Sequence, residues 1–224
     1  CLAAALAGAS WMNALPGQIG ATTRMNARCY GGEISKIIKS VTSITPQGEI
    51  KEYSASKVFL GYKNTIFMAG SEIVAEVVFN LTPGDKKKIL THMEYCKNDR
   101  IQKNQFLYPS CGCVFKNNYQ ANVPSGLLLE KAGVRKLSTN RVKISPFHAN
   151  FVFNNGAVAK EILETTINMR ELVFEKFGVW LEYEMEVLGN IPENLKSRFF
   201  FTRQQRFNTE ALLSLQQEFK NKQK

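Results

Sequence analysis

The chain has 224 residues, 44% of them apolar and 15 of them Phe, enough to bury the core of one large domain or two small ones. No stretch reaches the roughly 18 apolar residues of a membrane-spanning helix, so we expect no membrane partner. The net charge of +10 favours anionic partners, but the basic residues are scattered and no zinc-finger, zipper or RNA-binding pattern occurs, so we expect no nucleic-acid partner.

The cysteines do not form the pattern of a disulfide framework, because there are five of them at irregular spacing. With only two histidines in the chain, a Cys/His metal site is also disfavoured, and we expect no metal. The usage fits a reducing, cytoplasmic setting. The residues are Cys1, Cys29, Cys96, Cys111, Cys113, His92 and His148.

The start of the chain, Cys followed by small apolar residues, is compatible with the end of a signal peptide or a lipid-modified cysteine, but no basic segment precedes it. We expect instead an Ala- and Leu-rich helix over residues 2–12. Residues 17–32 hold four glycines among small residues, which allows either close approach of backbone to a ligand or a plain surface loop.

The middle of the chain predicts a hairpin, a strand and a helix. Residues 37–45 and 49–53 flank a Pro-Gln-Gly turn, and residues 73–81 are rich in β-branched residues. Thr82-Pro83 then signals the start of a helix that should run to about Arg100.

The second half predicts helices over residues 125–132, capped by Ser125, and over residues 160–177, each stopped by a glycine. Alternation of apolar and polar residues predicts a strand over residues 179–188. Residues 191–224 carry seven Lys/Arg against three Glu and should form a basic tail helix that docks through Leu212, Leu215 and Phe219. The uneven order of elements indicates an α+β fold.

No dinucleotide-binding or P-loop glycine motif is present, but short patterns recur through the chain in a fixed order. They are LPGQIG at residues 15–20, RMN at 24–26, YGGE at 30–33, GYKNTIF at 61–67, YPSCGCVFKN at 108–117, HANF at 148–151 and LEYE at 181–184. Together they resemble the UDP-N-acetylenolpyruvoylglucosamine reductases, whose members show IPGxxG, MNAGAYG, GYRxSxF, RxxK, PSAGSxFKNP, HANF and LExE. The resemblance covers roughly residues 6–189, and the lack of an extra loop insertion is typical of the shorter subtype.

The resemblance implies part of a vanillyl-alcohol-oxidase-type FAD-binding domain plus a smaller α+β substrate-binding domain. Residues 1–104 would form the second FAD-binding subdomain, residues 105–177 the substrate-binding domain and residues 178–190 a return strand to the FAD domain, before the tail at 191–224. The family opens with a flavin subdomain carrying a phosphate loop. We find no such segment in the sequence and expect a fragment of a longer protein.

The reaction implied is the NADPH-dependent reduction of UDP-N-acetylenolpyruvoylglucosamine to UDP-N-acetylmuramate through FAD, a step of cell-wall peptidoglycan synthesis. NADPH reduces the flavin, which passes hydride to the enolpyruvyl ether, and an acid then protonates the carbanion. The family proton donor, usually Ser, falls on Cys113, and a thiol of pKa about 8.5 remains mostly protonated at neutral pH. Lys63 stands where the family has Arg, which keeps the charge but loses the two-pronged hydrogen bond. Glu184 falls on the residue that polarises the enol intermediate.

The resemblance also assigns binding residues. The cofactor would contact Pro16, Gly17, Gly20, Asn26, Lys63 and Ile66, and the substrate would contact Lys103, Lys116 and Asn117. His148 is expected to be structural. Arg28 replaces a family glycine where backbone approaches the flavin, so its side chain must point away or clash. We expect a monomer.

Two alternatives to this enzyme are open. One is a non-catalytic UDP-sugar-binding remnant of the family, which the Lys63 and Arg28 replacements favour. The other is a different FAD-dependent oxidoreductase of the same superfamily.

Overall fold

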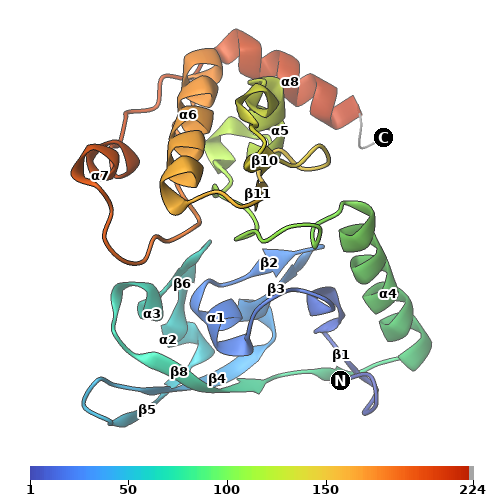
Figure 1. Cartoon of the computed structure of the whole chain (residues 1–224). Coiled ribbons are helices and arrows are strands. Elements are labelled where there is room, and N and C mark those ends of the chain that lie inside the picture. Colours follow the sequence, from blue (N-terminus) through green and yellow to red (C-terminus); the bar gives the residue numbers. More distant parts are fainter. Residues whose placement is uncertain (222–224) are drawn as a thin grey trace. The chain divides into compact units, whose positions relative to one another are not determined.

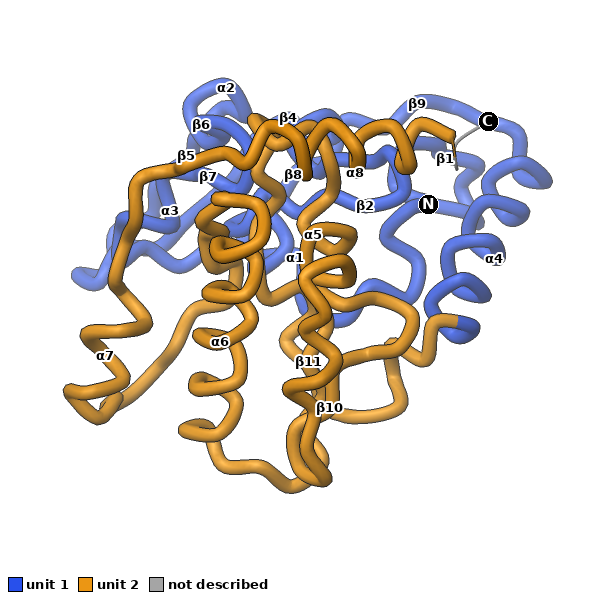
Figure 2. The backbone as a smooth tube through the Cα atoms, turned by 90° about the horizontal axis from the view of Figure 1, so that it is seen from above, with its two compact units in different colours: residues 1–102 blue, residues 103–224 orange. Residues whose placement is uncertain are grey.

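The computed structural model describes residues 1–221, and the chain divides into two compact units, Cys1–Gln102 and Lys103–Lys224 (Figure 2). The division lies close to the boundary expected after residue 104. Helices and short antiparallel sheets are mixed in both units, so the predicted α+β class is confirmed.

The first unit is built on a three-stranded antiparallel sheet in the order β5-β4-β8 (Figure 1). The strands are β4 (Ile38–Ile44), β5 (Ile50–Ser54) and β8 (Ile73–Phe79), so the predicted hairpin and the following strand are confirmed. Helix α1 (Ile19–Arg24) packs on β8, where a Cβ at Gly20 would lie 3.2 Å from the Val74 carbonyl oxygen. Gly20 therefore allows the helix to approach the sheet closely.

Short elements complete this unit around a core that includes Trp11, Ile34, Val41, Val58 and Phe67. These elements are β1 (Leu6–Ala7), η1 (Ser10–Met12), β2 (Arg28–Cys29), β3 (Gly32–Glu33), η2 (Ile34–Lys36), α2 (Ala55–Val58), β6 (Phe59–Gly61), β7 (Asn64–Thr65), α3 (Ile66–Ala69), β9 (Thr82–Pro83) and α4 (Lys86–Gln102).

Two predicted helix bounds in this unit are wrong for one reason. β1 pairs with β9, which places Leu6 opposite Pro83 and Ala7 opposite Thr82. The helix expected over residues 2–12 is therefore replaced by a strand and a turn of 3₁₀ helix. Helix α4 begins at Lys86 rather than near Thr82, and the Asp85 side chain accepts a hydrogen bond from the Lys88 amide at 2.8 Å.

The second unit packs helices around a short hairpin of β10 (Val142–Ile144) and β11 (Val152–Asn154). Helix α6 (Ala159–Phe177) supplies Leu163, Ile167, Met169, Val173 and Phe177 to the buried interior, which confirms the predicted apolar face. The other helical elements are η3 (Tyr119–Ala121), α5 (Ser125–Lys131), η4 (Val134–Leu137), α7 (Glu193–Phe199) and α8 (Thr209–Asn221). Helix α5 has the predicted place, but its N-cap is Pro124 rather than Ser125.

The continuous strand expected over residues 179–188 is wrong. Tyr183 forms an isolated antiparallel bridge with Phe115, and the neighbouring backbone is satisfied in other ways. The Gln205 side chain, for example, accepts from the Trp180 amide at 2.8 Å and donates to the Trp180 carbonyl at 2.9 Å. Backbone pairing with the Phe115 segment is confined to the neighbourhood of Tyr183, a side chain pairs with Trp180 instead of a strand, and the segment lies within the second unit.

The expected docking of the tail helix is confirmed within the second unit. Leu212 and Leu215 of α8 are buried in the same core cluster as Val173 and Phe177 of α6, and Phe219 is half-buried against it. Helix α7, which the sequence did not separate from the tail helix, packs on another part of α6.

Gly178 ends α6 in the left-handed conformation with φ of 65°, and a Cβ there would lie 1.7 Å from the Arg206 carbonyl oxygen. We expect Gly178→Ala to lower the free energy of unfolding by more than Gly133→Ala, which carries the same left-handed strain of about 1–2 kcal/mol but has open space around its Cβ. Urea unfolding of both variants measures the difference. Equal losses of the free energy of unfolding would show that the Arg206 carbonyl does not pack closely against Gly178.

Candidate functional site

Asn26 ties two of the predicted cofactor segments together inside the first unit. It is 2% exposed, and its Nδ2 donates to the Gly61 carbonyl at 2.9 Å and to Glu33 Oε1 at 3.2 Å. Within residues 1–221, its Oδ1 is a buried acceptor that has no hydrogen-bond partner in the structure, as is the Thr23 hydroxyl. An orphaned buried acceptor is costly, so this position suits a ligand that donates a hydrogen bond.

Lys63 lies next to this junction, in the turn between β6 and β7. Its backbone is left-handed, with φ of 50°, and only 8% of the residue is exposed. The Thr65 hydroxyl donates to the Arg24 carbonyl at 2.6 Å, which anchors the turn to the end of α1. Ile66 opens helix α3, which contacts α1. Asn26, Lys63 and Ile66 are therefore brought into one region.

The other predicted cofactor residues of this unit differ in setting. Pro16 and Gly17 are exposed, and Gly17 has φ of 108° with open space where a Cβ would stand. That space is what close approach of a ligand to backbone requires. Gly20 is accounted for by packing on β8. The Arg28 guanidinium lies 4.0 Å from Glu33 across its own β2–β3 hairpin.

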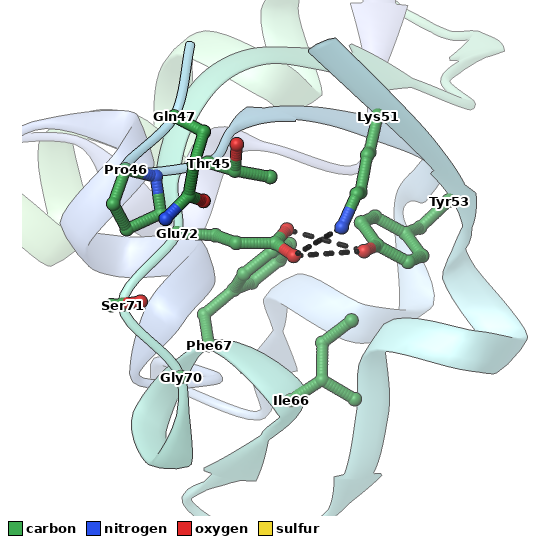
Figure 3. A pocket seen from close by; sticks show the side chains of 10 residues that line it. All are labelled: Thr45, Pro46, Gln47, Lys51, Tyr53, Ile66, Phe67, Gly70, Ser71 and Glu72. Carbon is green, nitrogen blue, oxygen red and sulfur yellow. Dashed lines mark hydrogen bonds and ion pairs between the residues drawn. The ribbon is translucent and has the colours of Figure 1, made fainter. Parts of the chain in front are cut away.

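A pocket of about 300 Å³ opens beside Ile66 in the first unit (Figure 3). Its lining includes Glu72, whose carboxylate accepts from the Ser43 hydroxyl at 2.5 Å, the Tyr53 hydroxyl at 3.1 Å and Lys51 Nζ at 3.5 Å. The hydrogen bond from Ser43 is the main cause that lowers the pKa of Glu72, assisted by Tyr53 and Lys51. The carboxylate is thus occupied by the protein's own donors and braces the sheet.

Cys113 lies in an extended segment of the second unit, and Asn150 bonds to the two residues that follow Cys113. Cys113 forms an antiparallel bridge with Phe151, and the Val114 amide donates to the Asn150 carbonyl at 2.9 Å. The Asn150 side chain accepts from the Phe115 amide at 2.9 Å and donates to the Phe115 carbonyl at 2.8 Å. Asn150 is 3% exposed, so these bonds are made in a dry interior. They fix the backbone that carries Cys113.

Glu184 is brought to the other side of the same segment. Its amide donates to the Val114 carbonyl at 2.8 Å, and the Lys116 amide donates to the Glu182 carbonyl at 2.9 Å. Glu184 and Cys113 are both half-buried. Burial is the main cause that raises the pKa of the Cys111 thiol, and the charge of Glu184 adds to it. The carboxylate therefore acts electrostatically on the loop that contains Cys113.

The predicted substrate residues are held by neighbours in the second unit. Lys116 Nζ lies 3.6 Å from Glu182 Oε2, and Asn117 Oδ1 accepts from the Ser125 amide at 2.9 Å, where α5 begins. Burial, followed by the positive charge of Lys103, lowers the pKa of His148, so this histidine is neutral near pH 7. Its Nδ1 accepts from the Asn150 amide at 3.3 Å, a structural contact.

Asn150 lies inside the HANF pattern, but its supporting role was not predicted from the sequence. Nor was that of Arg170, which is 3% exposed and stacks on Trp180 and Tyr183 at 4.1 and 4.5 Å from the ring centroids. Within residues 1–221, no helix is long and apolar enough to cross a membrane, and no cluster of three or more metal-ligating side chains occurs.

Comparison with known proteins gives consistent matches. Residues 102–188 match the family model described as the C-terminal domain of UDP-N-acetylenolpyruvoylglucosamine reductase. A protein of that name from Carboxydothermus hydrogenoformans is 35% identical over 185 residues, 82% of this chain and 61% of the relative. Another from Lactiplantibacillus plantarum is 33% identical over 187 residues, 83% of this chain and 61% of the relative. The chain thus spans about three fifths of the length of these curated relatives.

The fold also has a solved counterpart. The crystal structure of UDP-N-acetylenolpyruvylglucosamine reductase from Thermus caldophilus matches with a TM-score of 0.70 and 28% identity. The match covers 84% of this chain and 66% of that structure.

The clamp, meaning the two hydrogen bonds between the Asn150 side chain and the backbone of Phe115, can be tested by removing the side-chain amide. Asn150→Ala leaves a buried N–H and a buried carbonyl without partners, so we expect a loss of about 2–4 kcal/mol in the free energy of unfolding. Asn155→Ala is the control, since Asn155 is exposed and donates to the Asn140 carbonyl from the surface. Urea unfolding measures both. Losses of similar size would mean that the clamp contributes nothing beyond an exposed turn.

The Glu72 network predicts a pH dependence. A pKa held below the ordinary value of 4.5 contributes stability that is present above that value and is lost as the pH falls through the lower, folded-state pKa. The destabilisation caused by Glu72→Gln should therefore be larger near neutral pH than in strong acid, as measured by urea unfolding. Glu52→Gln, at an exposed position of β5, is the control. A destabilisation that did not change with pH would contradict this role of Glu72.

Proposed function

Because this chain is related in sequence and fold to the UDP-N-acetylenolpyruvoylglucosamine reductases, we propose that it carries the catalytic residues of such an enzyme. The reaction is the FAD-dependent reduction of UDP-N-acetylenolpyruvoylglucosamine to UDP-N-acetylmuramate with electrons from NADPH. The observation that carries the proposal is the meeting of the Cys113 and Glu184 segments through the Val114 carbonyl. Both segments lie within the residues that match the C-terminal family model.

Cys113 is the proposed proton donor. Addition of hydride to one carbon of the enolpyruvyl double bond leaves electron density on the other carbon and on the adjoining carboxylate. That carbon must then receive a proton. A thiol has one proton to give. Because the ordinary pKa of a thiol is about 8.5, it is mostly protonated at neutral pH. The bridge to Phe151 and the Asn150 bonds keep the Cys113 backbone in a fixed place for this transfer.

Glu184 and Lys63 are the proposed polarising residues. Glu184 is half-buried, and its backbone is anchored to Val114, so the residue that would polarise the enol system is attached to the segment of the proposed proton donor. Lys63 is nearly buried in its turn, and a charge with little exposure to water stabilises a developing negative charge more strongly than a solvated one.

Within the first unit, the residues present fit a flavin. Asn26 offers an unpartnered buried acceptor, while Gly17 and Gly61 leave open space beside left-handed backbone. FAD, when bound, supplies the hydride chemistry that side chains lack. Asn26 would accept a hydrogen bond from it, and the backbone at Gly17 would contact it closely. Pro16, Gly20 and Ile66 would shape the surrounding wall.

Lys103, Lys116 and Asn117 are the proposed substrate residues. The two lysines carry positive charge in the second unit, which suits a diphosphate. The Lys116–Glu182 pair is partly solvated, so Lys116 can exchange this partner for a phosphate at small cost. Asn117 Oδ1 accepts from the Ser125 amide at the start of α5, and Asn117 Nδ2 is the proposed donor to the substrate.

Substitution at Cys113 tests the proposal. We expect Cys113→Ala to lower kcat for substrate-dependent NADPH oxidation by about 10²–10⁴-fold, because the proton donor is lost. Cys113→Ser should retain activity, since a hydroxyl can occupy the same place. The control is Cys111→Ala, which removes the other thiol of the same loop. If Cys113→Ala binds FAD and keeps full activity, Cys113 is not the proton donor. If the wild-type protein binds flavin but has no activity, a UDP-sugar-binding remnant is favoured.

A further inference from the structure

Helix α7 lies beyond the region that matches the family model, which ends at residue 188, and it is packed firmly on α6. Leu195 is 1% exposed and Phe199 is 4% exposed, in a cluster with Leu163 and Ile167 of α6. The helix therefore has a defined place in the second unit.

Arg170 of α6 fastens the end of α7 to the segment that carries Glu184. Its NH2 group donates to the Arg198 carbonyl at 2.9 Å and to the Phe199 carbonyl at 3.1 Å. These carbonyls belong to the last turn of α7, where a cation is stabilising. The same guanidinium lies 4.5 Å from the ring centroid of Tyr183. One side chain thus joins the end of α7 to the ring beside Glu184.

Tyr183 is held within a stack of aromatic rings. Its ring lies 4.0 Å from that of Phe199 at an interplanar angle of 13°, and 4.9 Å from that of Phe115 at 27°. Its hydroxyl lies 3.5 Å from the Thr166 hydroxyl. Tyr183 precedes Glu184 in the chain and pairs with Phe115, two residues after Cys113. The ring thus belongs to the residue whose backbone pairs the Glu184 segment with the Cys113 segment.

The space around this stack is not filled by other side chains. A hollow of about 440 Å³ is lined by residues that include Arg170, Tyr183, Met185 and Phe199. Loss of the Phe199 ring would enlarge this hollow beside Tyr183 and remove the stacked ring, 4.0 Å away, that holds the tyrosine on that side.

We propose that Phe199 is a positioning residue which, through Tyr183, fixes the backbone that carries Glu184. The proposal rests on the proposed function for the catalytic role of Glu184, but the structural linkage itself is independent of that role. Phe199 would thereby make the segment after residue 188 part of the active-site framework.

The test compares three variants of the full chain. Phe199→Leu removes the ring but keeps apolar volume, Phe199→Tyr keeps the ring, and Leu213→Ala changes an exposed residue of α8 as the control. Amide hydrogen exchange is measured at Glu184 and Lys116, whose N–H groups bond to the carbonyls of Val114 and Glu182. The amide of Leu129 in α5 reports on the rest of the core.

We expect Phe199→Leu to speed exchange at Glu184 and Lys116 by up to about tenfold relative to Leu129, the scale set by losing an aromatic pair. Phe199→Tyr should restore slow exchange, and Leu213→Ala should leave it unchanged. Exchange that rises equally at all three amides, or at none, would overturn the proposal. If Phe199→Leu does not fold, Phe199→Met gives the same comparison with a side chain that adapts its shape.

Steady-state kinetics then separate this proposal from the proposed function. With an active enzyme, Phe199→Leu should lower kcat while leaving KM for NADPH unchanged, because the displaced group acts on the enolpyruvyl substrate. A fall in exchange protection without any change in kcat would overturn the link to catalysis. If the wild-type protein shows no NADPH oxidation, the proposed function fails, whereas the exchange measurements still decide the linkage from Phe199 to Glu184.

Discussion

The pairing of the Asn150 side chain with both the N–H and the carbonyl of Phe115 is the interaction on which the second unit depends. It substitutes for a neighbouring strand at a point where the hairpin does not extend, and it does so in the dry interior. With one edge of the segment satisfied in this way, the other edge is free to accept the chain around Tyr183. The segments that carry the proposed proton donor and the proposed polarising carboxylate are consequently joined by backbone hydrogen bonds.

The first unit holds two non-glycine residues in a left-handed backbone conformation near the proposed cofactor position. Asn26 and Lys63 both adopt left-handed backbone without being glycine, and each is buried. Such conformations persist where the surroundings hold them, here through the Gly61 carbonyl and the bond from Thr65 to Arg24. The unsatisfied Asn26 oxygen is consistent with a position prepared for a ligand.

The sequence predicted best what is local. The apolar face of α6 and the hairpin around Pro46 follow from periodicity and turn chemistry, and both are observed. The helix expected over residues 2–12 and the strand expected over residues 179–188 failed because distant partners decide those segments. Leu6 pairs with Pro83, and Trp180 bonds with Gln205.

The candidate site shows the same limit. The motifs identified Cys113, Lys63 and Glu184 as candidates. The HANF motif does not indicate that the side-chain amide of Asn150 bonds to the backbone of Phe115. The stacking of Phe199 on Tyr183 was likewise hidden, because it joins residues from two segments whose fold had to be known first. The roles of these residues stay predictions, as do the monomeric state and the cytoplasmic setting.

The most direct test of the central claim is flavin reoxidation in a single turnover. The protein is purified with FAD supplied, its flavin is reduced with NADPH in the absence of oxygen, and UDP-N-acetylenolpyruvoylglucosamine is then added. We expect the absorbance of oxidised flavin to return and UDP-N-acetylmuramate to form in equal amount. Flavin that stays reduced after the substrate is added would contradict it.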